Sequence, residues 1–274
     1  MSIASFYNQT RPVVFAHRGG SALGPENTIA AFDRGMAAGA DGLELDVHLS
    51  ADGVPVVHHD GMLDRTTDAA GPITARTAAE LARVDAAFHF RPADGFPLRG
   101  QGVGIPTLRE VLARYPVRTI VEMKMDVPEL GRAVARDIRL ASAEDRVCLA
   151  GFGSRSAAAA RADLPDTACS ASLAEARMDL YRSWVRWAPR GAAYGGYQVP
   201  ETAGRLRVVS PRFLRNAHRG GLKVYVWVVD EEPDMRRLLA WGVDGLISNR
   251  PDLAVRVRDA VCGESSRISG PIAP

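Results

Sequence analysis

GLELDVHLSADGVPVVHH, residues 42–59, holds the pattern that most restricts the possible folds of this chain. It contains two apolar segments, residues 42–47 and 54–59, with the composition of buried strands. Only the turn-forming residues Ser50-Ala51-Asp52-Gly53 lie between them. Because a connection this short cannot carry a crossover to a parallel neighbour but readily closes a hairpin, we expect the second segment to run back antiparallel beside the first.

The rest of the chain alternates strand candidates with segments of helical character. Strands are predicted at residues 13–17, 42–47, 54–59, 119–124, 147–152, 168–172, 192–198, 223–228 and 245–248. Without the hairpin strand, eight remain, which is the number of parallel strands in a TIM barrel. The sequence therefore predicts an α/β fold of the (β/α)8 TIM barrel class. A doubly wound open sheet is the alternative, because strand counting alone does not exclude it.

Helices are predicted between most of these strands, at residues 27–38, 107–114, 127–141, 154–162 and 233–241. Thr107 and Glu110 form a capping-box pattern, and Gly39 and Gly242 stand where helices are expected to end. Residues 60–105 interrupt the alternation, and we interpret them as a small insertion after the hairpin, with one short helix at residues 78–84. The prediction is a single domain over residues 1–263 followed by a flexible tail, residues 264–274.

Composition narrows the class of protein. The 274 residues carry 34 basic and 32 acidic side chains, a net charge of +2, which gives no reason to expect nucleic-acid binding. Cys148, Cys169 and Cys262 are an odd, scattered set without a C-x-x-C pair, which favours a reducing, cytoplasmic location. The N-terminus does not resemble a signal peptide, and no apolar run is long enough for a membrane span. The sequence does not indicate an oligomeric state.

The residues that carry chemistry are sought at the carboxyl ends of the parallel strands, where barrel enzymes place their active sites. The first strand ends in His17-Arg18-Gly19-Gly20. This motif offers a titratable base, a hydrogen-bond donor suited to phosphate, and glycines that allow the backbone to approach a ligand closely. The alternative interpretation is a core histidine before a tight turn. In the second strand, Glu44 and Asp46 are two residues apart and so share a face. Two carboxylates inside a barrel are costly unless neutralised, and their hard oxygens suit Mg²⁺ or Ca²⁺.

The neighbouring strands add further polar side chains. A hairpin closing between residues 49 and 54 places His59 opposite Glu44, whereas a one-residue bulge favours His58. Glu122 and Lys124 again share one strand face and offer a third carboxylate and a cation for phosphate. His48 is expected at the surface of the hairpin.

Trp227, near the end of a late strand, is either a barrel filler or a wall of the site that packs against a small substrate.

In this order, these residues resemble the glycerophosphodiester phosphodiesterase family of the phosphatidylinositol-phospholipase-C-like barrels. The likeness spans residues 13–255. The matching motifs are His17-Arg18-Gly19, Pro25-Glu26-Asn27-Thr28, Gly39-Ala40-Asp41-Gly42, Glu44-Leu45-Asp46-Val47, Asp52-Gly53, Val56-Val57-His58-His59-Asp60, Ile105-Pro106-Thr107-Leu108, Glu122-Met123-Lys124 and Gly242-Val243-Asp244-Gly245.

The resemblance implies a barrel enzyme that hydrolyses glycerophosphodiesters, which are small molecules, to glycerol 3-phosphate and an alcohol. It implies that His17 and His59, rather than His58, are the catalytic pair. It further implies the roles of the remaining site residues, with Glu44, Asp46 and Glu122 as ligands of a divalent metal cation, Mg²⁺ or Ca²⁺, Arg18 and Lys124 as phosphate ligands, and Trp227 beside the glycerol moiety.

Two segments depart from the family pattern. Residues 227–230 read Trp-Val-Val-Asp where the family more often has Trp-Thr-Val-Asn, and residues 247–251 read Ile-Ser-Asn-Arg-Pro where Thr-Asp-Arg-Pro is usual. We expect Asp230 and Asn249 to alter contacts on the glycerol side of the site.

Two alternative functions remain. A lysophospholipase-D-like or sphingomyelinase-D-like enzyme would need an apolar channel for a lipid phosphodiester, for which the insertion offers Phe88, Phe90 and Phe96. A non-catalytic module that binds a phosphate ligand is the alternative from another class, and the presence of both histidines and all three carboxylates argues against it.

Overall fold

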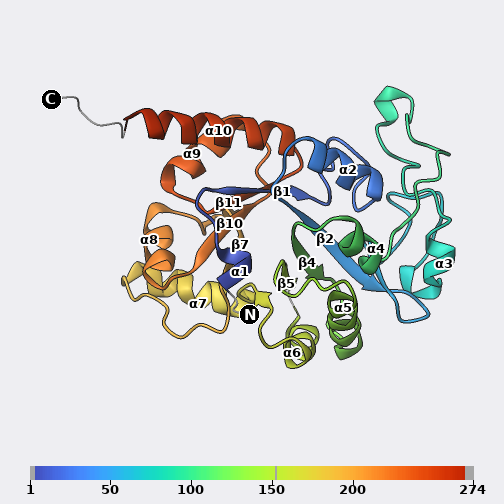
Figure 1. The fold of residues 1–274 in the computed structure, drawn as a ribbon, viewed down its shortest axis with the longest axis horizontal. Helices are drawn as coiled ribbons and strands as arrows, with labels where there is room; N and C mark the ends of the chain where they lie inside the picture. Colours follow the sequence, from blue (N-terminus) through green and yellow to red (C-terminus); the bar gives the residue numbers. More distant parts are fainter. Residues whose placement is uncertain (1–3, 152, 269–274) are drawn as a thin grey trace.

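The central sheet of the protein is a parallel barrel (Figure 1). The structure, a computed structural model, describes residues 4–151 and 153–268. Within these residues, eight strands follow in the order β6-β5-β4-β2-β1-β11-β10-β7, and each pair of neighbours is parallel. The strands are β1 Val13–His17, β2 Gly42–Leu49, β4 Arg118–Met123, β5 Val147–Gly151, β6 Ala168–Cys169, β7 Gly196–Pro200, β10 Lys223–Trp227 and β11 Gly245–Ser248.

A parallel bridge between Ser170 and Gly196 joins the two ends of this order. The backbone N–H of Ala171 also donates to the carbonyl of Gly196 over 2.9 Å. The sheet is thereby nearly closed, which confirms the predicted (β/α)8 TIM barrel over the open sheet.

The predicted hairpin is present, but its predicted register is wrong. Strand β3, Pro55–Val57, runs antiparallel to β2 with Val47 opposite Val57 and Leu49 opposite Pro55. The pairing is therefore one residue away from the predicted one, because the turn begins to close at Ser50, whose N–H donates to the carbonyl of Val54. In this register His59 is not the partner of Glu44.

Most of the helices surround the barrel in Figure 1, whereas the first lies over its centre and the third belongs to the insertion. The helices are α1 Ala4–Tyr7, α2 Ile29–Ala37, α3 Ala78–Leu81, α4 Leu108–Arg114, α5 Pro128–Leu140, α6 Ser154–Asp163, α7 Leu173–Trp184, α8 Pro211–Arg219, α9 Glu232–Trp241 and α10 Pro251–Ile268. The capping box predicted at Thr107 and Glu110 is formed at the start of α4. Gly242 ends α9 in the left-handed conformation, with φ of 92°, where glycine avoids the strain that a β-carbon brings.

The last helix enters the segment predicted as a tail. Helix α10 reaches Ile268, and residues 269–274 lie outside the described part of the chain. Among the described residues, no helix combines the length and apolar character needed to cross a membrane.

The insertion, residues 60–105, packs through a small apolar cluster of its own. Leu63, Ile73 and Leu81 are fully buried there, together with Val56 of the hairpin. It contains two short 3₁₀ turns, η1 Ile73–Ala75 and η2 Pro92–Asp94, and helix α3, which is shorter than predicted. A second small hairpin, β8 Thr202–Ala203 with β9 Leu206–Arg207, was not expected.

Aromatic side chains fill the amino-terminal end of the barrel. Phe6 and Tyr7 of α1 pack against Phe15 of β1 and Tyr225 of β10, and all four are buried. The opposite end, at the carboxyl ends of the strands, is where the polar side chains gather.

Candidate active site

One pocket of about 270 Å³ opens at the carboxyl ends of the barrel strands. It is lined by every side chain that the sequence analysis selected as a site residue. These are His17, Arg18, Glu44, Asp46, His59, Glu122, Lys124 and Trp227.

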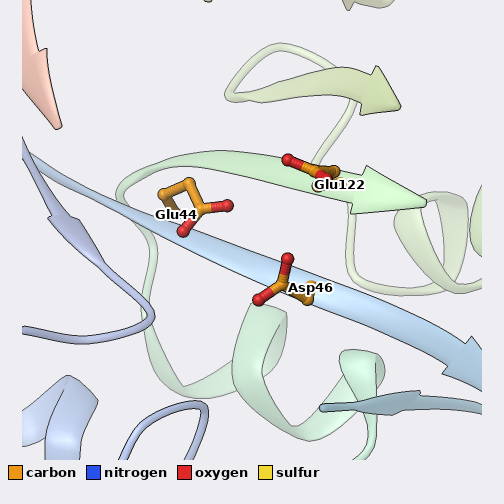
Figure 2. A group of neighbouring side chains, drawn as sticks. All are labelled: Glu44, Asp46 and Glu122. Atoms are coloured by element: carbon orange, nitrogen blue, oxygen red, sulfur yellow. The ribbon is translucent and has the colours of Figure 1, made fainter. Parts of the chain in front are cut away.

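Three carboxylates meet at one side of this pocket (Figure 2). Glu44 and Asp46 come from β2 and Glu122 from β4, and one oxygen of each lies within 4.8 Å of the others. The parallel register produces this arrangement, because it places Asp46 directly opposite Glu122. Glu44 and Asp46 are only 4% and 2% exposed, so their negative charges are poorly screened by water.

The electrostatics of this cluster fit a bound cation. Burial raises the pKa of Glu44 well above its ordinary value, and the charges of Asp46 and Glu122 raise it further. A divalent cation would relieve this repulsion, and three carboxylate oxygens are the donors that Mg²⁺ and Ca²⁺ prefer. The residues present therefore fit a hard metal ion.

Two basic side chains border the carboxylates. Arg18 Nε lies 3.2 Å from Asp46, and its guanidinium also donates to Glu26 over 3.0 Å. Lys124 Nζ lies 2.8 Å from Glu122 and 3.3 Å from Asp46. Burial lowers the pKa of Lys124, but the attraction of these two carboxylates outweighs it, so the pKa is raised and the ammonium stays charged.

His17 lies at the end of β1, beside the carboxylates. Its Nε2 is 3.8 Å from a Glu44 oxygen, and its Nδ1 is 2.7 Å from the side-chain oxygen of Asn249. Burial lowers the pKa of His17. Asn249, in turn, is hydrogen-bonded to Asp230. The two departures from the family pattern thus lie next to His17, and neither residue is among those that line the pocket.

His59 also lines the pocket and is held by a carboxylate. Its Nδ1 is 2.6 Å from Asp60, whose other oxygen accepts from Arg65 over 2.5 Å. Arg65 also donates to both oxygens of Glu26. Burial raises the pKa of Asp60, but the bonds from Arg65 and His59 outweigh it and hold the pKa far below its usual range.

The other two histidines of the hairpin do not line this pocket. His58 is buried, and its ring nitrogens contact the Asp60 carbonyl and the Thr66 hydroxyl. His48 is only 5% exposed and its Nε2 lies 3.0 Å from the carbonyl of His59. The expectation that His48 lies at the surface is therefore wrong, because the chain after β3 folds back over it.

Apolar side chains also line the pocket. Trp227, at the end of β10, is one of them, together with Leu173, Val199 and Ile247. The phenylalanines proposed for a lipid channel are not among the described residues that line it. Phe88 and Phe96 instead pack on the guanidinium of Arg99, whose carbon lies 4.0 and 3.5 Å from their ring centres.

Comparison with known proteins identifies the family of the chain. The model of the glycerophosphoryl diester phosphodiesterase family matches residues 17–253. The chain belongs to this family. A glycerophosphodiester phosphodiesterase from Caldanaerobacter subterraneus subsp. tengcongensis is 31% identical over 90% of this chain and 98% of its own length.

Solved structures of the family have the same fold. A glycerophosphodiester phosphodiesterase from Agrobacterium tumefaciens superposes with a TM-score of 0.74 at 27% identity, over 90% of this chain and 99% of its own. An Oleispira antarctica phosphodiesterase, solved in complex with the product sn-glycerol-3-phosphate, superposes with a TM-score of 0.73 at 24% identity, over 94% of this chain and 100% of its own. The chain is thus an enzyme of this phosphodiesterase family.

Several side chains that support the site were not predicted from the sequence. Asn27 donates to Asp46 over 2.9 Å, and Glu26 receives hydrogen bonds from both Arg18 and Arg65. Glu26 and Asn27 stand in a matching family motif, which was the available signal. Arg65 lies in the insertion, where no pattern marked it.

Proposed function

We propose that the protein is a metal-dependent phosphodiesterase that hydrolyses glycerophosphodiesters to glycerol 3-phosphate and an alcohol, with His17 and His59 as general acid and base. The observation that carries this proposal is that both histidines face one pocket with the three-carboxylate cluster and two cations. This is the set of groups that phosphoryl transfer needs, since it requires charge neutralisation and two proton transfers.

Glu44, Asp46 and Glu122 would hold the metal ion, Mg²⁺ or Ca²⁺. When bound, such an ion neutralises charge on the phosphate oxygens and lowers the pKa of a coordinated hydroxyl. Arg18 and Lys124 bind the remaining phosphate oxygens as charged donors, and both already lie within 3.3 Å of the carboxylate cluster.

The two histidines move the protons. Each has its Nδ1 against an oxygen, that of Asn249 for His17 and that of Asp60 for His59. This leaves Nε2 of each ring to act on substrate. One ring takes the proton of the attacking hydroxyl, and the other protonates the oxygen of the leaving alcohol.

Trp227 binds the carbon skeleton of the glycerol moiety against the apolar wall of the pocket. The product named in the Oleispira antarctica complex, sn-glycerol-3-phosphate, supports this choice of substrate for a barrel of the same fold. A cytoplasmic location, favoured by the odd, scattered set of three cysteines without a C-x-x-C pair, is part of the proposal.

Replacement of each histidine tests the proposal. His17→Ala and His59→Ala are expected to lower kcat for glycerophosphocholine by about 10²–10⁴, the usual contribution of general acid–base catalysis. His89→Ala is the matched control, because His89 is exposed on the insertion. If both site variants keep the activity of the control, the assignment of the catalytic pair is wrong.

A further inference from the structure

A chain of hydrogen bonds leads away from His17 to a carboxylate outside the pocket. The side-chain oxygen of Asn249 lies 2.7 Å from His17 Nδ1 and also accepts from the Ser21 hydroxyl over 2.5 Å. The side-chain N–H of Asn249 donates to Asp230 Oδ2 over 2.7 Å. Asp230 Oδ1 accepts from the backbone N–H of Asn249 and from the Ser248 hydroxyl. Among the described residues, the hydrogen bonds of Asp230 go to Asn249 and Ser248 and not to the ring.

The hydrogen bonds from His17 through Asn249 to Asp230 allow only one arrangement of protons. An ionised carboxylate is an acceptor only, so the atom of Asn249 that faces Asp230 must be its NH₂ group. The amide oxygen of Asn249 then faces His17, and it too can only accept. His17 must therefore carry its proton on Nδ1, which in the neutral ring leaves the lone pair on Nε2.

We infer that Asp230 is a positioning residue that acts through Asn249 to fix the orientation and the tautomer of His17. The inference rests on the proposed function, in which Nε2 of His17 exchanges a proton with substrate. Asp60 fixes the orientation and the tautomer of His59 directly, because it contacts the Nδ1 of that ring with no amide between them. The two rings thus reach the same tautomer by different means.

A single substitution reverses the arrangement. In Asp230→Asn, the oxygen of the new amide stays with its two donors, the Asn249 backbone N–H and the Ser248 hydroxyl. Its NH₂ group then faces the NH₂ group of Asn249, and two donors cannot pair. Asn249 is expected to flip and to offer its NH₂ to His17 Nδ1. The ring must then carry its proton on Nε2, where no lone pair remains for substrate.

A second substitution restores the arrangement. In the double variant Asp230→Asn with Asn249→Asp, the NH₂ group of residue 230 donates to the new carboxylate, and that carboxylate accepts from His17 Nδ1. Every hydrogen bond between His17, residue 249 and residue 230 is formed again, with the original tautomer of His17. A residue that only stabilised the fold would show no such rescue.

The test measures kcat and KM for glycerophosphocholine, the melting temperature, and the tautomer of His17 by ¹⁵N NMR of the ring. Asp230→Asn is expected to lower kcat by about 10²–10⁴ with little change in KM and with the proton of His17 moved to Nε2. The double variant is expected to regain most of the kcat and the Nδ1 proton. Asp234→Asn, in the first turn of α9 and with a side chain that is 44% exposed, is the matched control.

The inference is overturned if Asp230→Asn leaves the His17 tautomer unchanged, or if the double variant is no more active than the single one. Failure of the proposed function looks different, because the wild-type protein itself would then not release glycerol 3-phosphate. The NMR measurement judges the inference in that case too, since it does not depend on turnover.

Discussion

Glu26 connects the two halves of the site, and its replacement by Gln tests how much this connection stabilises the fold. One carboxylate oxygen accepts from Arg18 over 3.0 Å, and the guanidinium of Arg65 donates to both oxygens over 2.7 and 2.9 Å. Arg65 in turn holds Asp60, the partner of His59. The Glu26 side chain is 17% exposed, so water screens these contacts only weakly.

The pKa of Glu26 indicates how much its ionised carboxylate stabilises the folded state. Burial raises it, but the two arginines outweigh burial and lower it from 4.5 to about 2. A carboxyl group whose pKa is lowered by folding stabilises the folded state above its unfolded pKa and loses this effect as the pH falls through its folded pKa. The ionised Glu26 therefore contributes about 3 kcal/mol to the free energy of unfolding at pH 7 and roughly half of that at pH 3.

Urea unfolding of the wild type and of Glu26→Gln between pH 7 and pH 3 measures this contribution. The variant is expected to be less stable than the wild type at pH 7. The difference between their free energies of unfolding is expected to shrink as the pH falls. Glu144→Gln, at an exposed position, is the control for loss of one negative charge. If the difference in unfolding free energy between the wild type and Glu26→Gln stays constant over this pH range, Glu26 does not stabilise the fold through its ionised carboxylate.

Two further predictions concern the cluster and the apolar wall. Mg²⁺ or Ca²⁺ at 100 times its Kd is expected to raise the Tm of the wild type by roughly 5 °C, equivalent to about 2.7 kcal/mol for a chain of this length. Glu44→Gln should lose this shift while its metal-free form melts no lower than the wild type, because repulsion at the buried carboxylate is removed. An equal shift in both proteins by calorimetry contradicts the ligand assignment. Trp227→Ala is expected to raise KM for glycerophosphocholine more than it lowers kcat, and an unchanged KM contradicts its contact with the glycerol moiety.

The fold was largely predictable from the sequence because its deciding features are local. The bounds of β1 and β11 agree with the predicted ones, and the four-residue turn after β2 identified the hairpin. The register of that hairpin was not predictable, since it depends on how the turn at Ser50 closes. A shift of one residue changes every cross-strand pair.

The pocket residues were predictable because strand spacing and the family motifs both mark them. Asp230 and Asn249 were noticed, but their place behind His17 depends on a contact between residues 232 positions apart. The burial of His48 also depends on the chain that folds over it. Such contacts between loops leave no periodic signal in the sequence.

The decisive experiment measures release of glycerol 3-phosphate from glycerophosphocholine by the purified protein, first with EDTA and then with Mg²⁺ or Ca²⁺ restored. We expect EDTA to abolish release and one of the two cations to restore it. Release that EDTA leaves unchanged, or no release with either cation, would show that the protein is not the metal-dependent phosphodiesterase proposed here.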